Sequence, residues 1–231
     1  MFAEPPRTST DLEWELLGIP VRVNPWFWGV ALLMGWGLAD RPGLLAAWVA
    51  SLFVAILVHE LGHALCARTC GAHGVRIVLH GMGGLAFHAG RLTRARRIAI
   101  SLSGPGAGFL LYGLVYAALQ AVPPDRVPYG YRVVAGFLEW ICLGWGAVNL
   151  LPVLPLDGGH VARELLEALW PGRGQRRAAL LSLVTSAAVA LGFAALESQG
   201  RGYGYWPSLL FAYTAFLSWE TLQGVTYGRR F

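Results

Sequence analysis

The stretch His59-Glu60-Leu61-Gly62-His63 decides how the rest of the chain is interpreted. Residues four positions apart share one face of a helix, so His59 and His63 can place two imidazoles on one metal ion. Glu60 lies beside that face, where a carboxylate can take a proton from metal-bound water. This division of roles is typical of zinc peptidases.

The residues around this motif are apolar enough for a membrane span. Residues 44–58, which precede it, are almost wholly apolar, and residues 64–67 continue the helix after it. Ionisable groups inside a membrane helix are costly and indicate a functional site by default. The motif therefore predicts a metal site within the bilayer. The alternative is a chance match in which two buried histidines are hydrogen-bonded for structure alone.

The composition of the chain favours a polytopic membrane protein. Its 231 residues are 55% hydrophobic and 13% charged, with a mean hydropathy of +0.50. All 18 basic residues are arginines, and they stand between apolar segments. In that position they indicate membrane orientation rather than nucleic-acid binding. We therefore expect a lipid bilayer around the protein and no nucleic-acid partner.

Six apolar segments have about the length needed to cross a bilayer. The expected spans are residues 25–39, 44–67, 98–122, 133–151, 178–196 and 206–223. Residues 75–79 and 85–88 read as two short strands joined by a glycine-rich turn. The predicted fold class is an all-α polytopic membrane protein of about six transmembrane helices, with a small membrane-associated β-hairpin between helices two and three.

Several shorter segments have local signals of their own. Residues 1–15 are polar, and we expect them to be frayed or interfacial; residues 17–23 read as an extended segment in which Pro20 allows only an edge strand or none. Residues 103–108 are small and allow close helix approach, and Pro105 should kink that helix. The prolines and glycines of residues 152–159 should break any helix there.

The arginines predict the orientation of the spans. Only Arg41, Arg126, Arg132 and Arg201 fall on one side of the membrane, and the remaining arginines, including Arg229 and Arg230, fall on the other. Because positive residues mark the cytosolic side, both termini are expected there. The motif end of the second span and the Asp157 end of the fourth face the same side.

A catalytic zinc ion usually has three protein ligands and one open position, so a third ligand must be found. The chain has no Asp or Glu between Glu60 and Asp125. Asp157 is the preferred candidate, because irregular backbone and an ionisable residue at membrane depth require a protein-lined or wet cavity. An interfacial turn with a solvated Asp157 remains the alternative. Weaker candidates are His73, His80, His88, Cys66 and Cys70.

The chain resembles the site-2 protease family of intramembrane zinc metalloproteases, in its compact form without a PDZ or cystathionine-synthase-type domain. HELGH at residues 59–63 matches the HExxH signature, and NLLPVLPLDGGH at residues 149–160 matches the NxxPxxxLDGG element. LGIPVRVN at 17–24, the strand region at 75–86 and SGPGAG at 103–108 also resemble family segments. Gly108 stands where the family often has Asn.

The resemblance implies a function and a set of site residues. It implies that His59, His63 and Asp157 bind one zinc ion, that Glu60 is the catalytic acid and base, and that Asn149 positions substrate or stabilises the oxyanion. It also implies a single membrane-embedded peptidase domain over residues 1–231, with its core at about 17–165. The expected activity is cleavage of a transmembrane segment of a single-span, membrane-tethered substrate protein. The expected location is a bacterial or archaeal cytoplasmic membrane, with the active site toward the cytosol.

Two alternatives remain open. One is another class of membrane HExxH peptidase whose third ligand is Glu139, Glu164 or Glu167. The other is a zinc transporter or a scaffold without proteolytic activity. A transporter should have polar residues along a path through several spans, whereas the fifth and sixth spans have few. The sequence leaves the substrate's identity and the oligomeric state undetermined.

Overall fold

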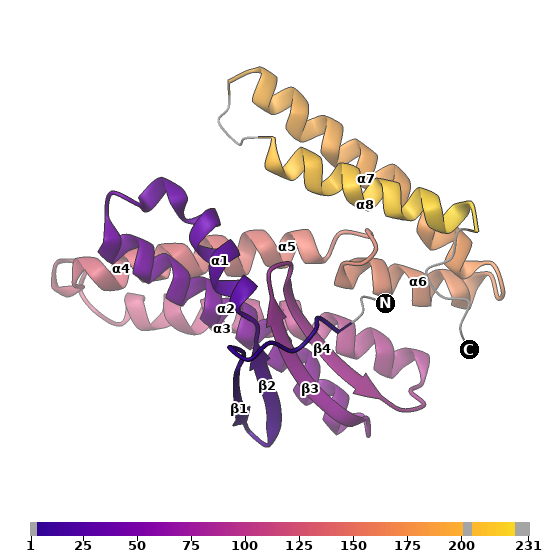
Figure 1. Cartoon of the computed structure of the whole chain (residues 1–231), viewed down its shortest axis with the longest axis horizontal. Helices are drawn as coiled ribbons and strands as arrows, with labels where there is room; N and C mark the ends of the chain where they lie inside the picture. Colours follow the sequence, from indigo (N-terminus) through magenta and orange to yellow (C-terminus); the bar gives the residue numbers. More distant parts are fainter. Residues whose placement is uncertain (1–3, 201–204, 225–231) are drawn as a thin grey trace. The chain divides into compact units, whose positions relative to one another are not determined.

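The computed structural model describes residues 4–200 and 205–224. The chain divides near residue 148 into two compact units. Arg201, Arg229 and Arg230, which entered the orientation argument, lie outside the described residues. Figure 1 labels the helices and strands of both units.

The structure is mostly helical. The unit before residue 149 contains α1 (Pro25–Met34), α2 (Pro42–Thr69), α3 (Arg94–Gln120) and α4 (Tyr129–Glu139), and the last continues through a π-helical turn at Trp140–Trp145 into α5 (Gly146–Asn149). Short 3₁₀ turns lie at Trp36–Leu38 and Pro124–Arg126. The unit after it contains α6 (Asp157–Leu169), α7 (Gly174–Ser198) and α8 (Trp206–Leu222).

Among the described residues, three helices are long and apolar enough to cross a membrane: α2, α3 and α7. The other expected spans are shorter or interrupted. Helix α1 has 10 residues and α8 has 17, and the fourth segment changes its hydrogen-bonding pattern at the π-helical turn. Helix α3 runs through Pro105 as one element.

The strand content is larger than a hairpin. Strands β1 (Leu12–Leu16), β2 (Ile19–Val23), β3 (His73–His80) and β4 (Gly83–Ala89) form one sheet in the order β1-β2-β3-β4. Strand β2 pairs parallel to β3, and the two other pairings are antiparallel. The expectation of an all-α fold with one hairpin was therefore incomplete. Residues 1–15 were expected to be frayed or interfacial, but residues 12–15 belong to strand β1.

The prediction for Pro20 was wrong, because β2 is an interior strand. Pro20 faces Glu15 of β1, whereas the pairing with β3 involves only Val21–Val23. The missing N–H of Pro20 therefore falls outside the β3 ladder and costs it no hydrogen bond. A parallel partner more than 50 residues further along the chain has no local sequence signal.

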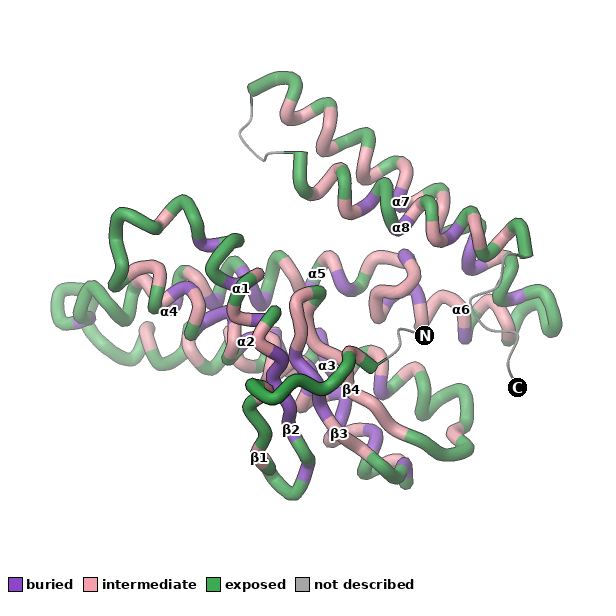
Figure 2. Tube along the Cα trace, viewed as in Figure 1, coloured by how far each residue is buried: buried purple, intermediate pink, exposed green. Residues whose placement is uncertain are grey.

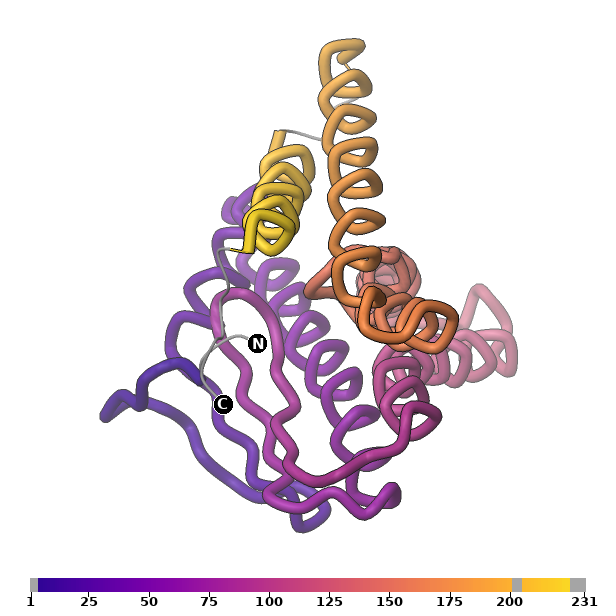
Figure 3. The backbone as a smooth tube through the Cα atoms, turned by 90° about the vertical axis from the view of Figure 1, so that its right-hand side faces the viewer, coloured from indigo at the N-terminus to yellow at the C-terminus, as the bar shows by residue number. Residues whose placement is uncertain are grey.

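The core of this unit lies between the sheet and α2. Ile19, Val21 and Val23 of β2 are buried together with Ile77 and Leu79 of β3. Ala64 of α2 and Phe27 of α1 complete the cluster. Figure 2 shows this buried stretch in purple along β2 and β3, and Figure 3 shows the β3–β4 hairpin, which packs on α2. The sheet is thereby fixed against the helix that carries the HELGH motif.

A buried arginine attaches the segment before β1 to the sheet. The Arg22 guanidinium donates to Asp11 at 2.8 Å and to Glu4 at 3.0 Å. A hydrogen bond from Arg76 holds the pKa of Glu4 below its usual value, and hydrogen bonds from Thr8 do the same for the pKa of Asp11. Both carboxylates are therefore ionised at neutral pH, and they keep Arg22 paired in its buried position.

Candidate metal centre

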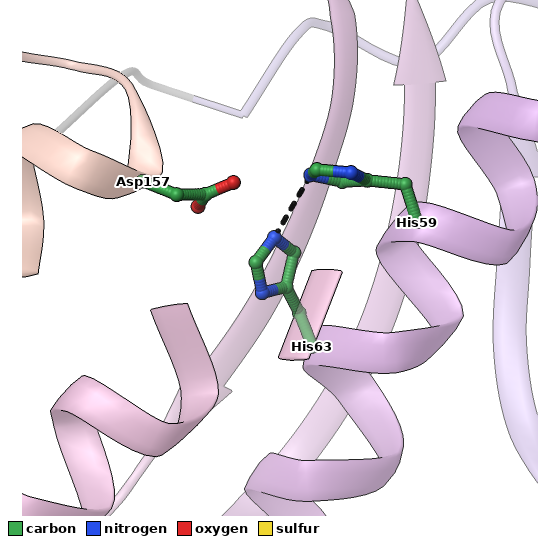
Figure 4. Close-up of side chains that lie close together, drawn as sticks. All are labelled: His59, His63 and Asp157. Atoms are coloured by element: carbon green, nitrogen blue, oxygen red, sulfur yellow. Dashed lines mark hydrogen bonds between the residues drawn. The ribbon is translucent and has the colours of Figure 1, made fainter. Parts of the chain in front are cut away.

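Helix α2 brings the two histidines of the HELGH motif together. His59 and His63 lie on successive turns, and their Nε2 atoms are 3.1 Å apart. Figure 4 shows the two imidazoles turned toward one another. Two nitrogens bound tetrahedrally to one zinc ion at about 2.0–2.1 Å each lie about 3.3 Å apart. The observed spacing is within hydrogen-bond distance and is also compatible with two ligands of one ion.

The other ring nitrogen of His63 fixes its tautomer. His63 Nδ1 lies 2.6 Å from the carbonyl oxygen of Ile100 in α3, and His63 is buried. Because a carbonyl can only accept, Nδ1 carries the proton and donates it. Nε2 is then the ring nitrogen without a proton, and its lone pair faces His59 Nε2. Metal-binding histidines commonly have such a partner, which also fixes the ring orientation.

Glycines let α3 approach both histidines. A Cβ atom on Gly104 would overlap the imidazoles of His63 and His59, and one on Gly62 would overlap the Ser103 backbone and Ala107. This contact confirms that the small residues at 103–108 allow close helix approach. The space beside the two Nε2 atoms therefore exists because residue 104 has no side chain. The sequence analysis named this segment for packing and missed its role beside the metal ligands.

Gly104→Ala should weaken zinc binding by about tenfold or more, the size of loss seen when the support of a metal ligand is disturbed. The added methyl group forces the two imidazoles from their shared position. The matched control is Gly106→Ala in the same helix, since a Cβ there meets nothing within 4 Å. Zinc affinity measured by chelator competition checks this. Equal affinities for the two variants would contradict the steric argument.

Glu60 lies on the side of α2 that faces the sheet. The residue is buried, at 6% exposure, and a Cβ atom on Gly84 of β4 would overlap its side chain. The backbone of β4 therefore covers the Glu60 carboxylate closely. This arrangement shields a potential proton acceptor from bulk water next to the two imidazoles, and the close approach requires glycine at residue 84.

In the unit that follows residue 148, the helical backbone is interrupted before Asp157, as predicted. Asp157 is the first residue of α6 and is half-buried, and Figure 4 labels its carboxylate. Cβ atoms on Gly158 and Gly159 would overlap the backbone of residues 150–154. The two glycines thus let the preceding loop fold directly onto the start of α6. Asn149, at the end of α5, is buried.

The weaker ligand candidates have other surroundings. His73 is exposed at the start of β3, and His80 at its end accepts the N–H of Met82 at 3.2 Å. Burial, with Arg22 nearby, lowers the pKa of His80; burial, with His63 nearby, lowers that of His88. Cys66 and Cys70 are free thiols packed near Ile100. Among the described residues, none of these five belongs to a group of three side chains able to hold a metal ion.

The acidic alternatives to Asp157 also have their own partners. The Glu167 carboxylate accepts the N–H groups of Gly172 at 2.6 Å and Gly174 at 2.8 Å, so it closes the turn before α7. Glu164 lies 3.5 Å from Arg163. Glu139 lines a hollow of about 150 Å³ beside Tyr112 and Arg132. Glu167 has a clear structural role, and none of the three is part of a metal-binding group within the described residues.

The donor chemistry of the predicted set fits zinc. His59, His63 and Asp157 each offer one ligand atom, and two imidazoles with one carboxylate are ligands that zinc accepts. The tautomer of His63 and the clearance at Gly104 are those of a ligand prepared for a metal. Three protein ligands leave one position open, as catalytic zinc requires.

Comparisons with known proteins agree with this chemistry. The sequence model of peptidase family M50 matches residues 125–193. A relative from Synechocystis sp., whose name proposes a zinc metalloprotease, is 33% identical over 180 residues, which cover 72% of this chain and 46% of the relative. A zinc metalloprotease of Methanocaldococcus jannaschii is 27% identical over 153 residues, covering 66% of this chain and 44% of the relative. The chain spans about half the length of these relatives.

A solved structure has the same fold. The site-2 protease from Methanocaldococcus jannaschii superimposes with a TM-score of 0.61 at 21% identity, covering 96% of this chain and 99% of that one. At this identity the likeness concerns the fold. It extends over nearly all of both chains, so the helices and the sheet described above belong to one known architecture.

Proposed function

Because this chain belongs to the site-2 protease family, peptidase family M50, we propose that it is a zinc-dependent intramembrane endopeptidase. Its substrate is a membrane-tethered protein with a single span, cut within or beside that span. The observation that carries the proposal is the His59–His63 pair, with Nε2 atoms 3.1 Å apart and Nδ1 of His63 held by Ile100. Such a pair, next to a buried glutamate, is the core of a metallopeptidase site.

Each candidate site residue has a separate role in hydrolysis. His59, His63 and Asp157 would hold the ion, and zinc bound there would supply the Lewis acidity that polarises a scissile carbonyl and acidifies water. Glu60 accepts the proton of the attacking water and returns it to the leaving amine as the C–N bond breaks. Asn149 donates a hydrogen bond to the substrate peptide or to the oxyanion.

A substrate helix must unwind before its backbone can react, and β4 offers the unwound segment a place to bind. Strand β4 is at the edge of the sheet and has β3 as its one neighbour. An extended peptide can add to such an edge through backbone hydrogen bonds. Gly84 of β4 lies against Glu60, so a peptide paired along β4 passes close to the catalytic base.

The protein is an integral membrane protein, and its topology completes the proposal. Helices α2, α3 and α7 cross the bilayer, and the shorter segments around α1, α4–α5 and α8 supply three further crossings. The arginine distribution supports an orientation in which both termini and the zinc site face the cytosol of a bacterial or archaeal cell. No nucleic acid takes part.

Zinc removal tests the proposed function. The purified protein, in detergent or nanodiscs, is incubated with single-span substrates taken from the host membrane. Chelation should reduce cleavage to background, and stoichiometric zinc should restore it, because water activation depends on the ion. Zinc flux into vesicles is measured in parallel. Cleavage that survives complete zinc removal, or zinc flux without cleavage, would reject the proposal in favour of another protease class or a transporter.

A further inference from the structure

Four residues with hydroxyl side chains are buried in helices α7 and α8. Ser182 and Ser186 of α7 are fully buried, and Thr214 and Ser218 of α8 are at most 6% exposed. The two helices run side by side (Figure 1). These spans have few polar residues in the sequence, and no role was expected for their hydroxyls. In apolar helices, buried hydroxyls need partners, and those partners show what the hydroxyls do.

The hydrogen bonds of Ser182 form a chain with one possible direction. Ser218 Oγ donates its proton to the Thr214 carbonyl at 2.8 Å. Since a serine has one proton, Ser218 must accept in its 2.7 Å bond to Ser182, and Ser182 is the donor. Ser182 Oγ in turn accepts the backbone N–H of Leu154 at 2.8 Å. The chain thus runs from Leu154 through both serines to the α8 backbone.

Leu154 belongs to the loop that positions Asp157. The loop lies between α5 and α6, and Asp157 follows Leu154 by three residues. On the other side of Asp157, Gly158 and Gly159 fix the same loop by close backbone contact. Two contacts therefore hold the backbone on either side of Asp157: the close packing of Gly158 and Gly159 in α6, and the hydrogen bond from Leu154 to the Ser182 hydroxyl of α7.

We propose that Ser182 is a positioning residue for the third zinc ligand: its hydroxyl, oriented by Ser218, holds the Leu154 amide and thereby sets where Asp157 presents its carboxylate. The proposal rests on the proposed function, in which Asp157 binds zinc. Partners that orient a metal ligand from outside its first coordination sphere typically change metal affinity about 10- to 100-fold when removed. Ser182 acts through the loop backbone rather than through the carboxylate itself.

Ser186 provides a matched control. It lies one turn further along α7, is as fully buried as Ser182, and accepts a hydrogen bond from Thr214 Oγ1 at 3.1 Å. This bond joins α7 to α8, whereas Ser182 joins α7 to both α8 and the loop. Replacing either serine removes one buried hydroxyl from the same helix interface, so a difference between them reports on the loop.

The experiment compares Ser182→Ala and Ser186→Ala in the full chain by thermal unfolding and by chelator competition for zinc. Both variants should lose similar thermal stability. Ser182→Ala should raise the zinc dissociation constant about tenfold, and Ser186→Ala should change it less than twofold. Cleavage by Ser182→Ala should fall at limiting zinc and recover as zinc is raised, with the KM for substrate unchanged. A general packing defect would not produce this zinc-dependent recovery.

Equal zinc constants for the two variants would overturn the positioning role. Ser182→Cys keeps a side chain of similar shape but offers a weak acceptor, so it should also weaken zinc binding; wild-type affinity there would overturn the proposal too. Asp157→Ala separates this failure from failure of the proposed function. If Asp157→Ala loses zinc while Ser182→Ala does not, Asp157 is a ligand but Ser182 does not position it. If Asp157→Ala keeps zinc, the assigned ligand itself is wrong.

Discussion

Replacing Glu60 with Gln should abolish peptide cleavage and leave zinc bound. The amide is almost the same size as the carboxylate, so it fits the space beneath Gly84 of β4. It cannot accept the proton of the attacking water or return it to the leaving amine. General acid–base groups contribute about 10²–10⁴-fold to rate, and we expect a loss within this range. The His63 imidazole remains in place, because the Ile100 carbonyl rather than the Glu60 charge fixes its tautomer.

Cleavage rate and zinc content, measured on the same preparation, check this prediction. Glu139→Gln is the control, since it makes the same change in α4, where Glu139 lines a hollow with Tyr112 and Arg132. It should cleave at the wild-type rate. Comparing the membrane proteomes of wild type and Glu60→Gln cells should reveal an accumulated single-span protein as the substrate. Retained cleavage by Glu60→Gln would show that another group moves the proton.

Replacing Asp157 with Ala should remove both zinc and cleavage. The change deletes one of three ligands, and the expected loss of zinc affinity is more than about 100-fold, the upper end for partners outside the first coordination sphere. The backbone of the loop should stay folded, because Gly158, Gly159 and the Leu154–Ser182 hydrogen bond hold it without the carboxylate.

Zinc stoichiometry after dialysis against a weak chelator measures this loss. Asp125→Ala is the control, because Asp125 is an exposed aspartate in the 3₁₀ turn after α3. It should keep one zinc per chain. A stoichiometric zinc in Asp157→Ala, lost instead on replacing Glu164, would reassign the third ligand and favour the alternative class of HExxH peptidase.

Local patterns predicted the helix that carries the HELGH motif well. The i, i+4 spacing of His59 and His63 places both imidazoles on one face of α2 whatever surrounds the helix, and the structure has them 3.1 Å apart. The prolines and glycines of residues 152–159 predicted the broken backbone before Asp157 for the same reason, since each residue restricts its own dihedral angles. The roles of Asp157 and Asn149 in the site remain predictions.

Longer-range features were not visible in the sequence. The prediction that β2 is an edge strand or no strand relied on Pro20 alone. Its place inside the sheet comes from pairing with β3, more than 50 residues away. Among the described residues, three of the six expected spans are helices long and apolar enough to cross a membrane. Hydropathy predicts where a chain is apolar, but it does not predict a π-helical turn within α4–α5 or the early end of α1.

The sequence by itself determined which residues are the candidate ligands and the candidate base, and that one helix presents both histidines, because these depend on residue type and on spacing within about one turn of backbone. Tertiary structure alone decided that the Ile100 carbonyl fixes the His63 tautomer, that Gly104 leaves room beside both imidazoles, and that Ser182 holds the loop before Asp157. Each of these contacts joins residues about 30 or more positions apart. Such contacts follow from how helices pack, which no local pattern of residues encodes.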